Sequence, residues 1–293
     1  MRLDSRQTTA FLAVAEHGSF EIAAQQLHLT SSALSQRIKA LELELNSVLF
    51  VRSRPCRLSN AGQRLLSHLK RLQILENEVY SDLLGEAAGT NNLALAVNAD
   101  SLDTWFLPAV AEFCQQQAIT LDLCVDDQDH TQTLLAQGQV LACISTLAQS
   151  LPGCEAEFLG VMRYQAACSK AFYQRWFAQG VNFASLRLAP LVNYNRKDQL
   201  QRRFLHEHFG LQQSQWVCHH IPASTPFNQA LSLGLGWGMM PEHMLTKPHD
   251  LQLLAQDKPI DVPLYWHSWK LQGRSLNLLK QELILQAQTQ LRQ

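Results

Sequence analysis

The stretch SSALSQRIKALE, residues 31–42, has two unlike faces when it is placed on a helix. Leu34, Ile38 and Leu41 lie three or four residues apart, so they share one side of the helix. We expect this side to pack against a hydrophobic core. The opposite side carries short or hydrogen-bonding residues, namely Ser32, Ser35, Gln36 and Lys39. A solvated helix surface normally mixes Glu with Lys, whereas acid is absent here until Glu42. The pattern predicts an amphipathic helix whose polar face contacts a partner.

Two helical patterns precede this stretch and frame it. Residues 8–17 form the first, which Gly18 can end, and Ser19 can cap the second. The segment HLTSS is a turn, with Thr30 or Ser31 as the cap of the third helix. These elements predict a helix-turn-helix. The major groove of B-DNA accommodates one helix, and Ser, Thr and Gln can hydrogen-bond to base edges. A solvated face is the simpler interpretation of a lone helix, but the neighbouring sequence favours DNA.

The following sequence, VLFVRSRPCRLSNAG, predicts a short strand and a basic loop. Arg52, Arg54 and Arg57 resemble the wing of a winged helix, where arginines contact phosphates. Ser59 is a suitable cap for a long helix over residues 60–84. Its apolar residues lie three or four apart: Leu65, Leu69, Leu72, Leu75, Val79 and Leu83. Packing against its own chain remains an alternative, but we favour pairing with a second copy.

Charge divides the chain into a basic and an acidic part. Residues 1–71 hold ten Lys and Arg against five Asp and Glu, a net charge of +5, and the remainder holds 14 against 20, a net charge of −6. This predicts a basic module that binds a polyanion and an acidic module with another task. Seven cysteines without a CxxC pair favour reduced thiols, and no segment resembles a signal peptide or a membrane span. We therefore expect a cytoplasmic protein without a membrane partner.

The run GSFEIAAQQLHLTSSALSQRIKALELEL, continued by LFVRSRPCRLSNAGQRLL, resembles the N-terminal module of LysR-type transcriptional regulators. The resemblance implies an α+β multidomain chain with a winged helix-turn-helix over residues 1–59, a linker and dimerisation helix with a hinge over 60–88, and an effector-binding α/β domain over 89–293. The expected DNA contacts are Thr30, Ser31, Ser32, Ser35, Gln36, Arg37, Lys39, Arg52, Arg54 and Arg57.

Beyond residue 90, strand-like runs alternate with helical ones. The strands are LALAVN, LDLCVDD, VLACIST, RYQAACS, PLVNYN, GWGMM and LYWHSW, and Pro241 is a candidate helix start. This alternation predicts a largely parallel sheet, with ligands beyond the carboxyl ends of its strands. The resemblance implies a periplasmic-binding-protein-like effector domain, with one subdomain over about 89–161 and 266–293, a second over about 162–265, and a pocket between them.

Within the LysR family the chain is most similar to the branch of ArgP (IciA) and LysG. AVNADSLDTWFLPA, VDD with TQTLL, and LYWH carry this likeness, which implies a basic amino acid, lysine or arginine, as effector and control of amino acid export or metabolism. The candidate effector contacts are Asn98, Asp100, Ser101, Asp127, Ser145, Thr146 and Thr225. Carboxylates can bind an ammonium or guanidinium group, and helix N–H groups an α-carboxylate. Helix capping is the simpler role for both Asp residues. The resemblance favours ligand contact for Asp100 and leaves Asp127 undecided.

We found no pattern for a catalytic nucleophile, a metal or a cofactor, so we expect no enzyme and no cofactor. The expected partners are double-stranded promoter DNA, a small effector, and further copies of the chain in a homodimer or homotetramer. Contact with RNA polymerase stays open. Three alternatives remain: a LysR-type regulator of another metabolite, a ligand-independent architectural DNA-binding protein, and an enzyme with a DNA-binding appendage.

Overall fold

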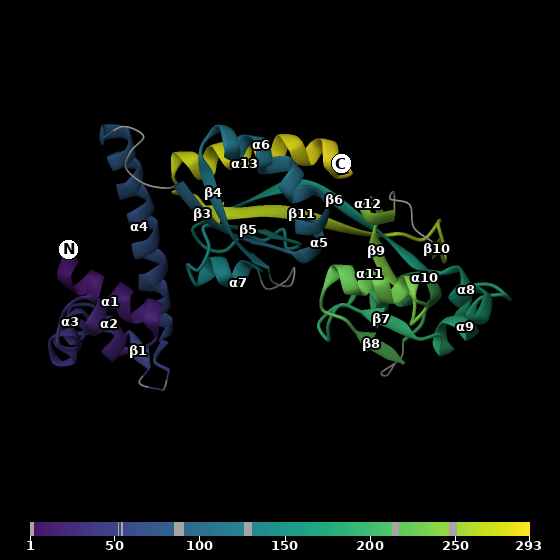
Figure 1. Cartoon of the computed structure of the whole chain (residues 1–293), viewed down its shortest axis with the longest axis horizontal. Coiled ribbons are helices and arrows are strands. Elements are labelled where there is room, and N and C mark those ends of the chain that lie inside the picture. Colours follow the sequence, from purple (N-terminus) through teal and green to yellow (C-terminus); the bar gives the residue numbers. More distant parts are fainter. Residues whose placement is uncertain are drawn as a thin grey trace.

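The computed structural model describes residues 3–51, 53, 55–84, 91–125, 131–212, 217–245 and 251–293 (Figure 1). Its helices are α1 (Ser5–His17), α2 (Phe20–Gln26), α3 (Ser31–Glu44), α4 (Asn60–Leu84), α5 (Ala99–Ser101), the π-helical turn η1 (Leu102–Phe106), α6 (Leu107–Gln116), α7 (Thr131–Ala136), α8 (Lys170–Trp176), α9 (Phe183–Leu188), α10 (Leu200–Phe209), α11 (Ser224–Ser232), α12 (Glu242–Leu245) and α13 (Arg274–Gln290). Its strands are β1 (Phe50–Val51), β2 (Arg57–Leu58), β3 (Asn91–Val97), β4 (Ile119–Val125), β5 (Ala142–Ser145), β6 (Cys154–Ser169), β7 (Leu191–Asn193), β8 (Cys218–His220), β9 (Gly238–Pro241), β10 (Leu251–Leu253) and β11 (Ile260–Trp269).

The N-terminal unit consists of α1, α2 and α3 with the antiparallel pair β1 and β2, and α4 leads out of it (Figure 1). The predicted helix ends are confirmed. Gly18 ends α1 in the left-handed conformation, Ser19 caps α2, and the Thr30 hydroxyl accepts from the amide of Ala33. The helix α1 begins earlier than predicted because the Asp4 carboxylate accepts from two backbone amides of its first turn.

The start of the long helix α4 is also as predicted. The Ser59 hydroxyl accepts a hydrogen bond from the amide of Gly62 and thereby caps the helix that follows. The strand pair β1–β2 precedes it, with Phe50 opposite Leu58. Phe50 is buried against Phe11 of α1, so the hairpin is anchored in the same core as the helices.

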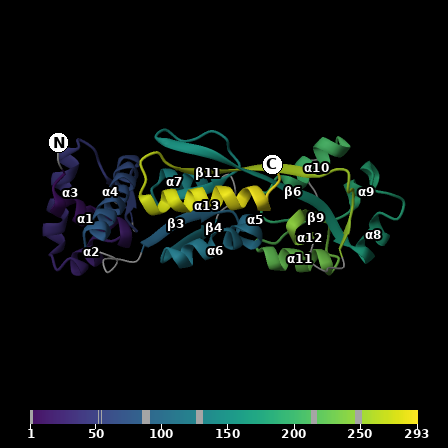
Figure 2. The same cartoon turned by 90° about the horizontal axis from the view of Figure 1, so that it is seen from above.

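The middle lobe is built on a mixed sheet. Its strand order is β10-β6-β11-β5-β3-β4, with β9 also paired to β6. Only β3 pairs in parallel with its neighbours β4 and β5; the pairings of β6 and β11 are antiparallel. The expectation of a largely parallel sheet was therefore wrong, because these two long strands return through the sheet in opposite directions. Helices α6 and α13 lie on one face and α7 on the other (Figures 1 and 2).

Strands β6 and β11 connect the middle lobe to a second, smaller lobe. At about 3.3 Å per residue the sixteen residues of β6 extend roughly 50 Å. The far end of β6 pairs with β9 and with β10, beside the two-stranded sheet of β7 and β8 (Figure 1). The predicted strand RYQAACS is only the second half of β6. Pro241 ends β9 opposite Tyr164, and the expected helix, α12, begins at the next residue, Glu242, one residue later than predicted.

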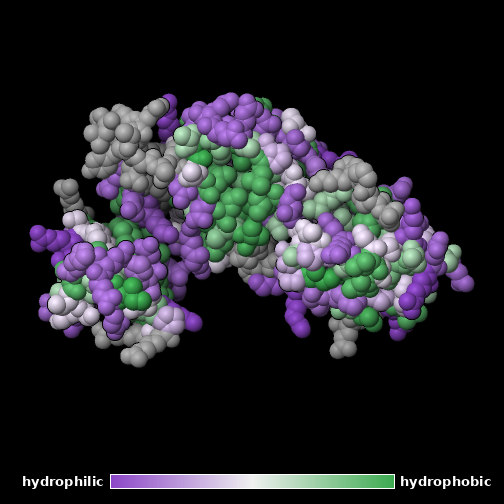
Figure 3. All heavy atoms as spheres, in the orientation of Figure 1, coloured by the Kyte–Doolittle hydropathy of each residue, from purple (hydrophilic) through white to green (hydrophobic). Residues whose placement is uncertain are grey.

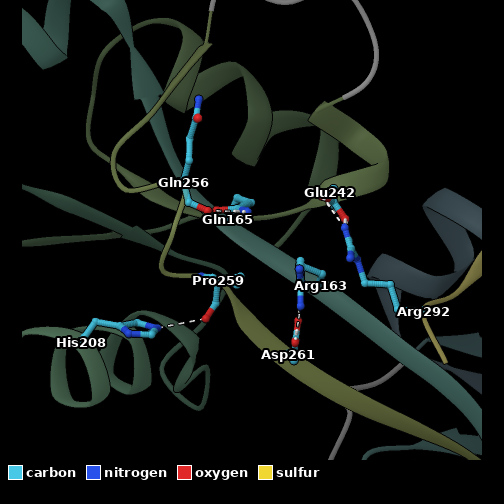
Figure 4. Close-up of polar contacts among 8 residues, drawn as sticks. All are labelled: Arg163, Gln165, His208, Glu242, Gln256, Pro259, Asp261 and Arg292. Carbon is cyan, nitrogen blue, oxygen red and sulfur yellow. Dashed lines mark hydrogen bonds and ion pairs between the residues drawn. The ribbon is translucent and has the colours of Figure 1, made fainter.

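Polar contacts tie the two lobes together beside the connecting strands (Figure 4). The Arg163 guanidinium of β6 pairs with Asp261 of β11 at 2.7 Å. Arg292, just beyond α13, pairs with Glu242 of α12 at 2.8 Å. Exposed ion pairs of this kind contribute little stability, on the order of 0–1 kcal/mol. Arg163–Asp261 is a cross-strand pair between β6 and β11, and of the two only Arg292–Glu242 joins an element of the middle lobe to one of the smaller lobe.

The cysteines and the helices bear on two expectations for the whole chain. No pair of the seven cysteines, all of which are described, forms a disulfide, and four of the seven are buried. In the parts of the chain that the structure describes, no helix has the length and apolar character needed to cross a membrane.

Candidate functional sites

The polar face of α3 lies at the outer end of the molecule, away from the two lobes (Figures 1 and 2). Leu34, Ile38 and Leu41 are buried, each stabilising the fold by roughly 1.5–3 kcal/mol. The predicted contact residues of the opposite face are exposed: Thr30, Ser31, Ser32, Ser35, Gln36 and Lys39. Arg37 is half-buried at its edge. This face is available to a partner as large as a nucleic acid.

Glu42, the acidic residue beside this polar face, directs its carboxylate away from it. The Glu42 carboxylate accepts hydrogen bonds from the amides of Leu49 and Phe50, at 2.7 and 3.4 Å. It therefore ties the end of α3 to the hairpin, and its charge is directed at backbone N–H groups. Arg57 is exposed on β2 of the same hairpin. The other predicted wing residues, Arg52 and Arg54, lie outside the described residues.

Part of the apolar stripe of α4 packs within the N-terminal unit. Leu65 and Leu69 are buried in the N-terminal core, whereas Leu72 is exposed. The side chains of Leu75, Val79 and Leu83 lie outside the described set. Leu65 and Leu69 therefore pack against their own chain, which is the alternative to pairing with a second copy.

A cavity of about 740 Å³ lies between the middle lobe and the smaller lobe. This volume is within the range of roughly 300–1,000 Å³ that is common for small-molecule sites. Asn98, Asp100 and Thr146 line it from the carboxyl ends of β3 and β5. The opposite wall comes from the β7–α10 loop, α10, α11, β9 and α12, and includes Phe227 and Met239. The cavity combines charged groups with an apolar wall that suits an aliphatic chain.

Asp100 is a strongly perturbed carboxyl group at the wall of the cavity. Burial raises its pKa to about 6, although the hydrogen bond from the Tyr164 hydroxyl, at 2.7 Å, lowers it in part. The nearby carboxylates of Asp198 and Asp103 raise it further. Asp100 is therefore mostly ionised at neutral pH, at a cost in desolvation that a cationic ligand would relieve.

Asn98 presents an unused amide to the same cavity. It is only 2% exposed, and both polar atoms of its side chain lack a hydrogen-bond partner among the described residues. It precedes α5 without capping it through its side chain. Since buried polar groups normally find partners, an orphaned donor and acceptor at a cavity wall indicates a ligand position.

The remaining candidates are placed differently. Ser101 and Ser145 are fully buried and do not line the cavity, and Thr225 is exposed on α11. Its neighbour Ser224, which begins that helix, lines the cavity instead. Asp127 lies outside the described residues. The structure thus brings three of the seven predicted effector residues together at one cavity.

A buried network holds the loop that carries Thr146. The Leu147 carbonyl accepts from His267 of β11 at 2.8 Å, and the Gln149 carbonyl accepts from Gln132 of α7 at 3.1 Å. Burial lowers the pKa of His267, so its ring is neutral at neutral pH. The neutral ring has one N–H, and the bond to Leu147 uses it.

Sequence reasoning missed the residues of the smaller lobe that line the cavity. Tyr194, Asp198 and Arg203, which follow β7, line the cavity. Tyr164 of β6 was also missed; it is buried behind the cavity wall and donates to Asp100. Asp198 follows the predicted strand PLVNYN as Asp100 follows LALAVN, so the position after a strand could have selected it, although for Asp100 it was the resemblance that favoured ligand contact. Tyr164 gave no such signal within its strand.

Two family models match the chain. Residues 5–63 match the model described as "Bacterial regulatory helix-turn-helix protein, lysR family", and residues 87–287 match the LysR substrate binding domain. The transcriptional regulator ArgP of Vibrio vulnificus (strain YJ016) is 36% identical, over 99% of this chain and 98% of its own length.

Solved structures of full length are also similar. The crystal structure of ArgP from Mycobacterium tuberculosis is 36% identical with a TM-score of 0.90, and 99% of each chain is covered. LysG from Corynebacterium glutamicum with the bound effector Arg is 32% identical with a TM-score of 0.81, over 99% of this chain and 100% of that chain.

Proposed function

We propose, since this chain belongs to the LysR family of bacterial helix-turn-helix regulators, that a basic amino acid held between its two lobes controls its DNA binding. By that membership the chain is a DNA-binding transcriptional regulator. Arginine and lysine are the candidate effectors, and genes of amino acid export or metabolism are the candidate targets. The observation that carries the proposal is the ionised Asp100 at the wall of the cavity between the lobes. The similar LysG structure, which holds the bound effector Arg, supports the same ligand class.

The chemistry of the cavity supports a basic amino acid. Asp100 offers a carboxylate to an ammonium or guanidinium group, and charge-assisted hydrogen bonds of this type are strong. Phe227, Met239 and Met240 provide apolar contacts for the methylene groups of the side chain. Asn98 can hydrogen-bond with either end of the ligand. A neutral apolar metabolite would leave the charge of Asp100 without a counter-ion and the amide of Asn98 without a hydrogen-bond partner.

The division of labour follows the expected domains. We propose residues 1–59 as the DNA-binding unit, 60–88 as linker and hinge, and 89–293 as the effector domain, with its two subdomains over 89–161 with 266–293 and over 162–265. The α3 face would read bases, and the exposed Arg57 would contact phosphate. Promoter DNA lies in the cytoplasm, so we place the protein there. The chain would act by binding alone, without catalysis.

A second copy of the chain is the expected assembly partner. Hydrophobic residues gather on the visible face of the middle lobe, whereas hydrophilic residues cover much of the N-terminal unit (Figure 3). Among the exposed apolar residues of this lobe is Leu107 of α6, which is 46% exposed. Contiguous apolar surface of this kind favours association. A two-fold dimer would present two α3 helices to paired half-sites on DNA.

A thermal-shift screen of the full chain against the amino acids tests the effector class. Arginine or lysine should raise the Tm of the wild-type protein, and Asp100→Asn should abolish the shift, since its side chain carries no charge. The exposed Asp257→Asn removes the same charge away from the cavity and should keep the shift. A shift with only neutral compounds would point to another metabolite. No shift with any amino acid would leave a ligand-independent DNA-binding protein as the better description.

A further inference from the structure

We propose that residues 291–293, which follow α13, form a clasp that holds the two lobes in their present arrangement and is coupled to the cavity between them. The clasp joins the end of α13 to β6 and to α12. None of its three residues, which are all described, lines the cavity. The coupling to a ligand rests on the proposed function, whereas the clasp itself does not.

The connection between the lobes narrows to two strands. Residues 265–268 of β11 pair with β5 of the middle lobe, and residues 164–169 of β6 pair with β9 and β10 of the smaller lobe. Between these segments, residues 160–163 of β6 pair with residues 261–264 of β11 and with no other described strand. Two strands alone are only marginally stable, so we expect the angle between the lobes to change at this ribbon.

A β-bulge with a glycine lies where the ribbon leaves the middle lobe. The register of β6 and β11 shifts by one residue beside Gly160, which leaves Leu159 as the extra residue of β6. Gly160 has a φ of +141°, and a Cβ atom built on it would lie 2.7 Å from the Cβ of Leu291. Glycine therefore permits both the bend of the strand and the close approach of the clasp.

The clasp is attached to the ribbon through its backbone. The amide of Val161 donates to the carbonyl of Arg292 at 2.7 Å, and the amide of Arg292 donates to the carbonyl of Val161 at 3.2 Å. On its other side Val161 pairs with Pro263, which lines the cavity. The hydrogen bond of the Val161 amide thus reports whether the clasp is in place, one strand away from the cavity.

A side chain of the clasp reaches the smaller lobe (Figure 4). The Arg292 guanidinium donates to both carboxylate oxygens of Glu242, at 2.8 and 3.0 Å, and this forked geometry is more specific than a single contact. Beside it, the His243 ring donates to the carbonyl of Gln290 at the end of α13. Glu242 and His243 belong to α12, whose Met244 lines the cavity. The clasp is therefore connected to the cavity wall through one short helix.

Coupling between the clasp and the cavity follows from this arrangement. A ligand shifts a conformational equilibrium only by its difference in affinity for the two states. An effector that contacts both lobes binds the clasped arrangement more tightly than an opened one, in which the two walls of the cavity separate. By reciprocity it also holds the clasp closed, although it does not touch the clasp.

Residue-resolved hydrogen–deuterium exchange of the full-length protein tests the clasp without a ligand. Arg292→Glu replaces the attraction to Glu242 by a repulsion and should speed exchange of the Val161 amide roughly three- to tenfold. Adding Glu242→Arg to this variant restores an ion pair and should return the rate to within about twofold of wild type. The amide of Leu141, which is hydrogen-bonded within the middle lobe, should not change and thereby excludes global unfolding. Arg187→Glu makes the same charge change at an exposed position of α9 and should behave as wild type.

The outcomes separate the clasp from the proposed function. Exchange of Val161 that stays at the wild-type rate in Arg292→Glu, or that the swapped pair does not restore, would overturn the clasp. Saturating arginine should slow this exchange at least about threefold in the wild-type protein. Arginine that raises the Tm without slowing exchange would overturn the coupling and leave the effector class standing. If neither arginine nor lysine raises the Tm, the proposed function and the coupling both fail, while the ligand-free rates still decide on the clasp.

Discussion

At the scale of single residues, the buried charge of Asp100 lowers the stability of the unliganded fold at neutral pH, while the same charge favours a cationic ligand. The raised pKa means that the folded chain holds this proton more tightly than the unfolded chain does. The residue therefore stabilises the fold below about pH 4, and this contribution is lost as the pH rises through about 6. Above that pH the buried charge costs on the order of 2–3 kcal/mol. A cationic ligand would offset this cost.

The substitution Asp100→Asn should consequently stabilise the protein without ligand. Its amide oxygen can still accept from Tyr164, but no charge is buried. We expect a Tm several degrees above wild type at pH 7.5 and no difference near pH 4, measured by calorimetry at both pH values. A lower Tm of the variant at pH 7.5 would contradict the desolvation of Asp100.

Arginine binding should weaken in acid for the same reason. The ligand prefers ionised Asp100, whose pKa is raised by burial and by the charges of Asp198 and Asp103 and lowered in part by Tyr164. Below about pH 6 the apparent affinity should therefore fall, by up to about tenfold per pH unit. Titrations between pH 5 and 8 measure this slope. A slope that persists unchanged in Asp100→Asn would assign the effect to another group.

Gln36 and Arg57 should have distinguishable effects on DNA binding. Loss of a base contact in Gln36→Ala should cost about 1–3 kcal/mol on the preferred sequence and little on unrelated DNA. Arg57→Ala should weaken binding to all sequences and reduce the salt slope by about one. Fluorescence anisotropy on both DNA types separates these effects. The exposed Gln115→Ala of α6 is the control, and a uniform loss for Gln36→Ala would exclude base reading.

At the scale of elements, α4 is the physical link between the N-terminal unit and the middle lobe. It passes Gly138, which follows α7 with a φ of +65°. A Cβ atom built on Gly138 would lie 2.3 Å from the Cα of Ser67 in α4. Both the close approach and the left-handed backbone require glycine here. The contact fixes how the DNA-binding unit is placed relative to the lobe that holds Asp100.

Gly138→Ala should therefore disturb this link. Gly210→Ala is a matched control, because Gly210 has a φ of +64° but no atom within 4 Å of an added Cβ. Both variants pay the cost of the left-handed conformation, about 1–2 kcal/mol. Only Gly138→Ala must also move α4, so it should lower Tm more and alter the effect of arginine on DNA binding. Equal Tm losses and an unaltered arginine effect would show that the contact has no role.

Elements determined by local signals were predictable from the sequence, and those determined by distant pairing were not. Caps at Ser19, Thr30 and Ser59 and the glycine at residue 18 act within one helical turn, so they located the first four helices. The length of β6 depends on pairing with β11 almost a hundred residues later, and no local pattern records it. The position of Asp100 after a strand was visible in the sequence, and the family resemblance favoured ligand contact over a helix cap. Its contact with Tyr164 became visible only in the fold.

At the scale of the whole molecule, charge and connectivity divide the tasks. The first 71 residues carry a net charge of +5 and the remainder −6, which suits one part to a polyanion and the other to cations. Only β6 and β11 pass between the lobes among the described strands, and Arg292 with Glu242 bridges the same junction (Figure 4). A change of angle at this junction moves the middle lobe, and α4 can transmit it to α3.

The central claim is that binding of a basic amino acid and binding of DNA are coupled. The most direct test measures the Kd for DNA of the full-length protein, on a site selected from random sequences, with and without saturating arginine or lysine at fixed salt. A coupling of the usual size would change the Kd roughly 5–150-fold in wild type and leave it unchanged in Asp100→Asn. An identical Kd with and without both amino acids in the wild-type protein would contradict the account.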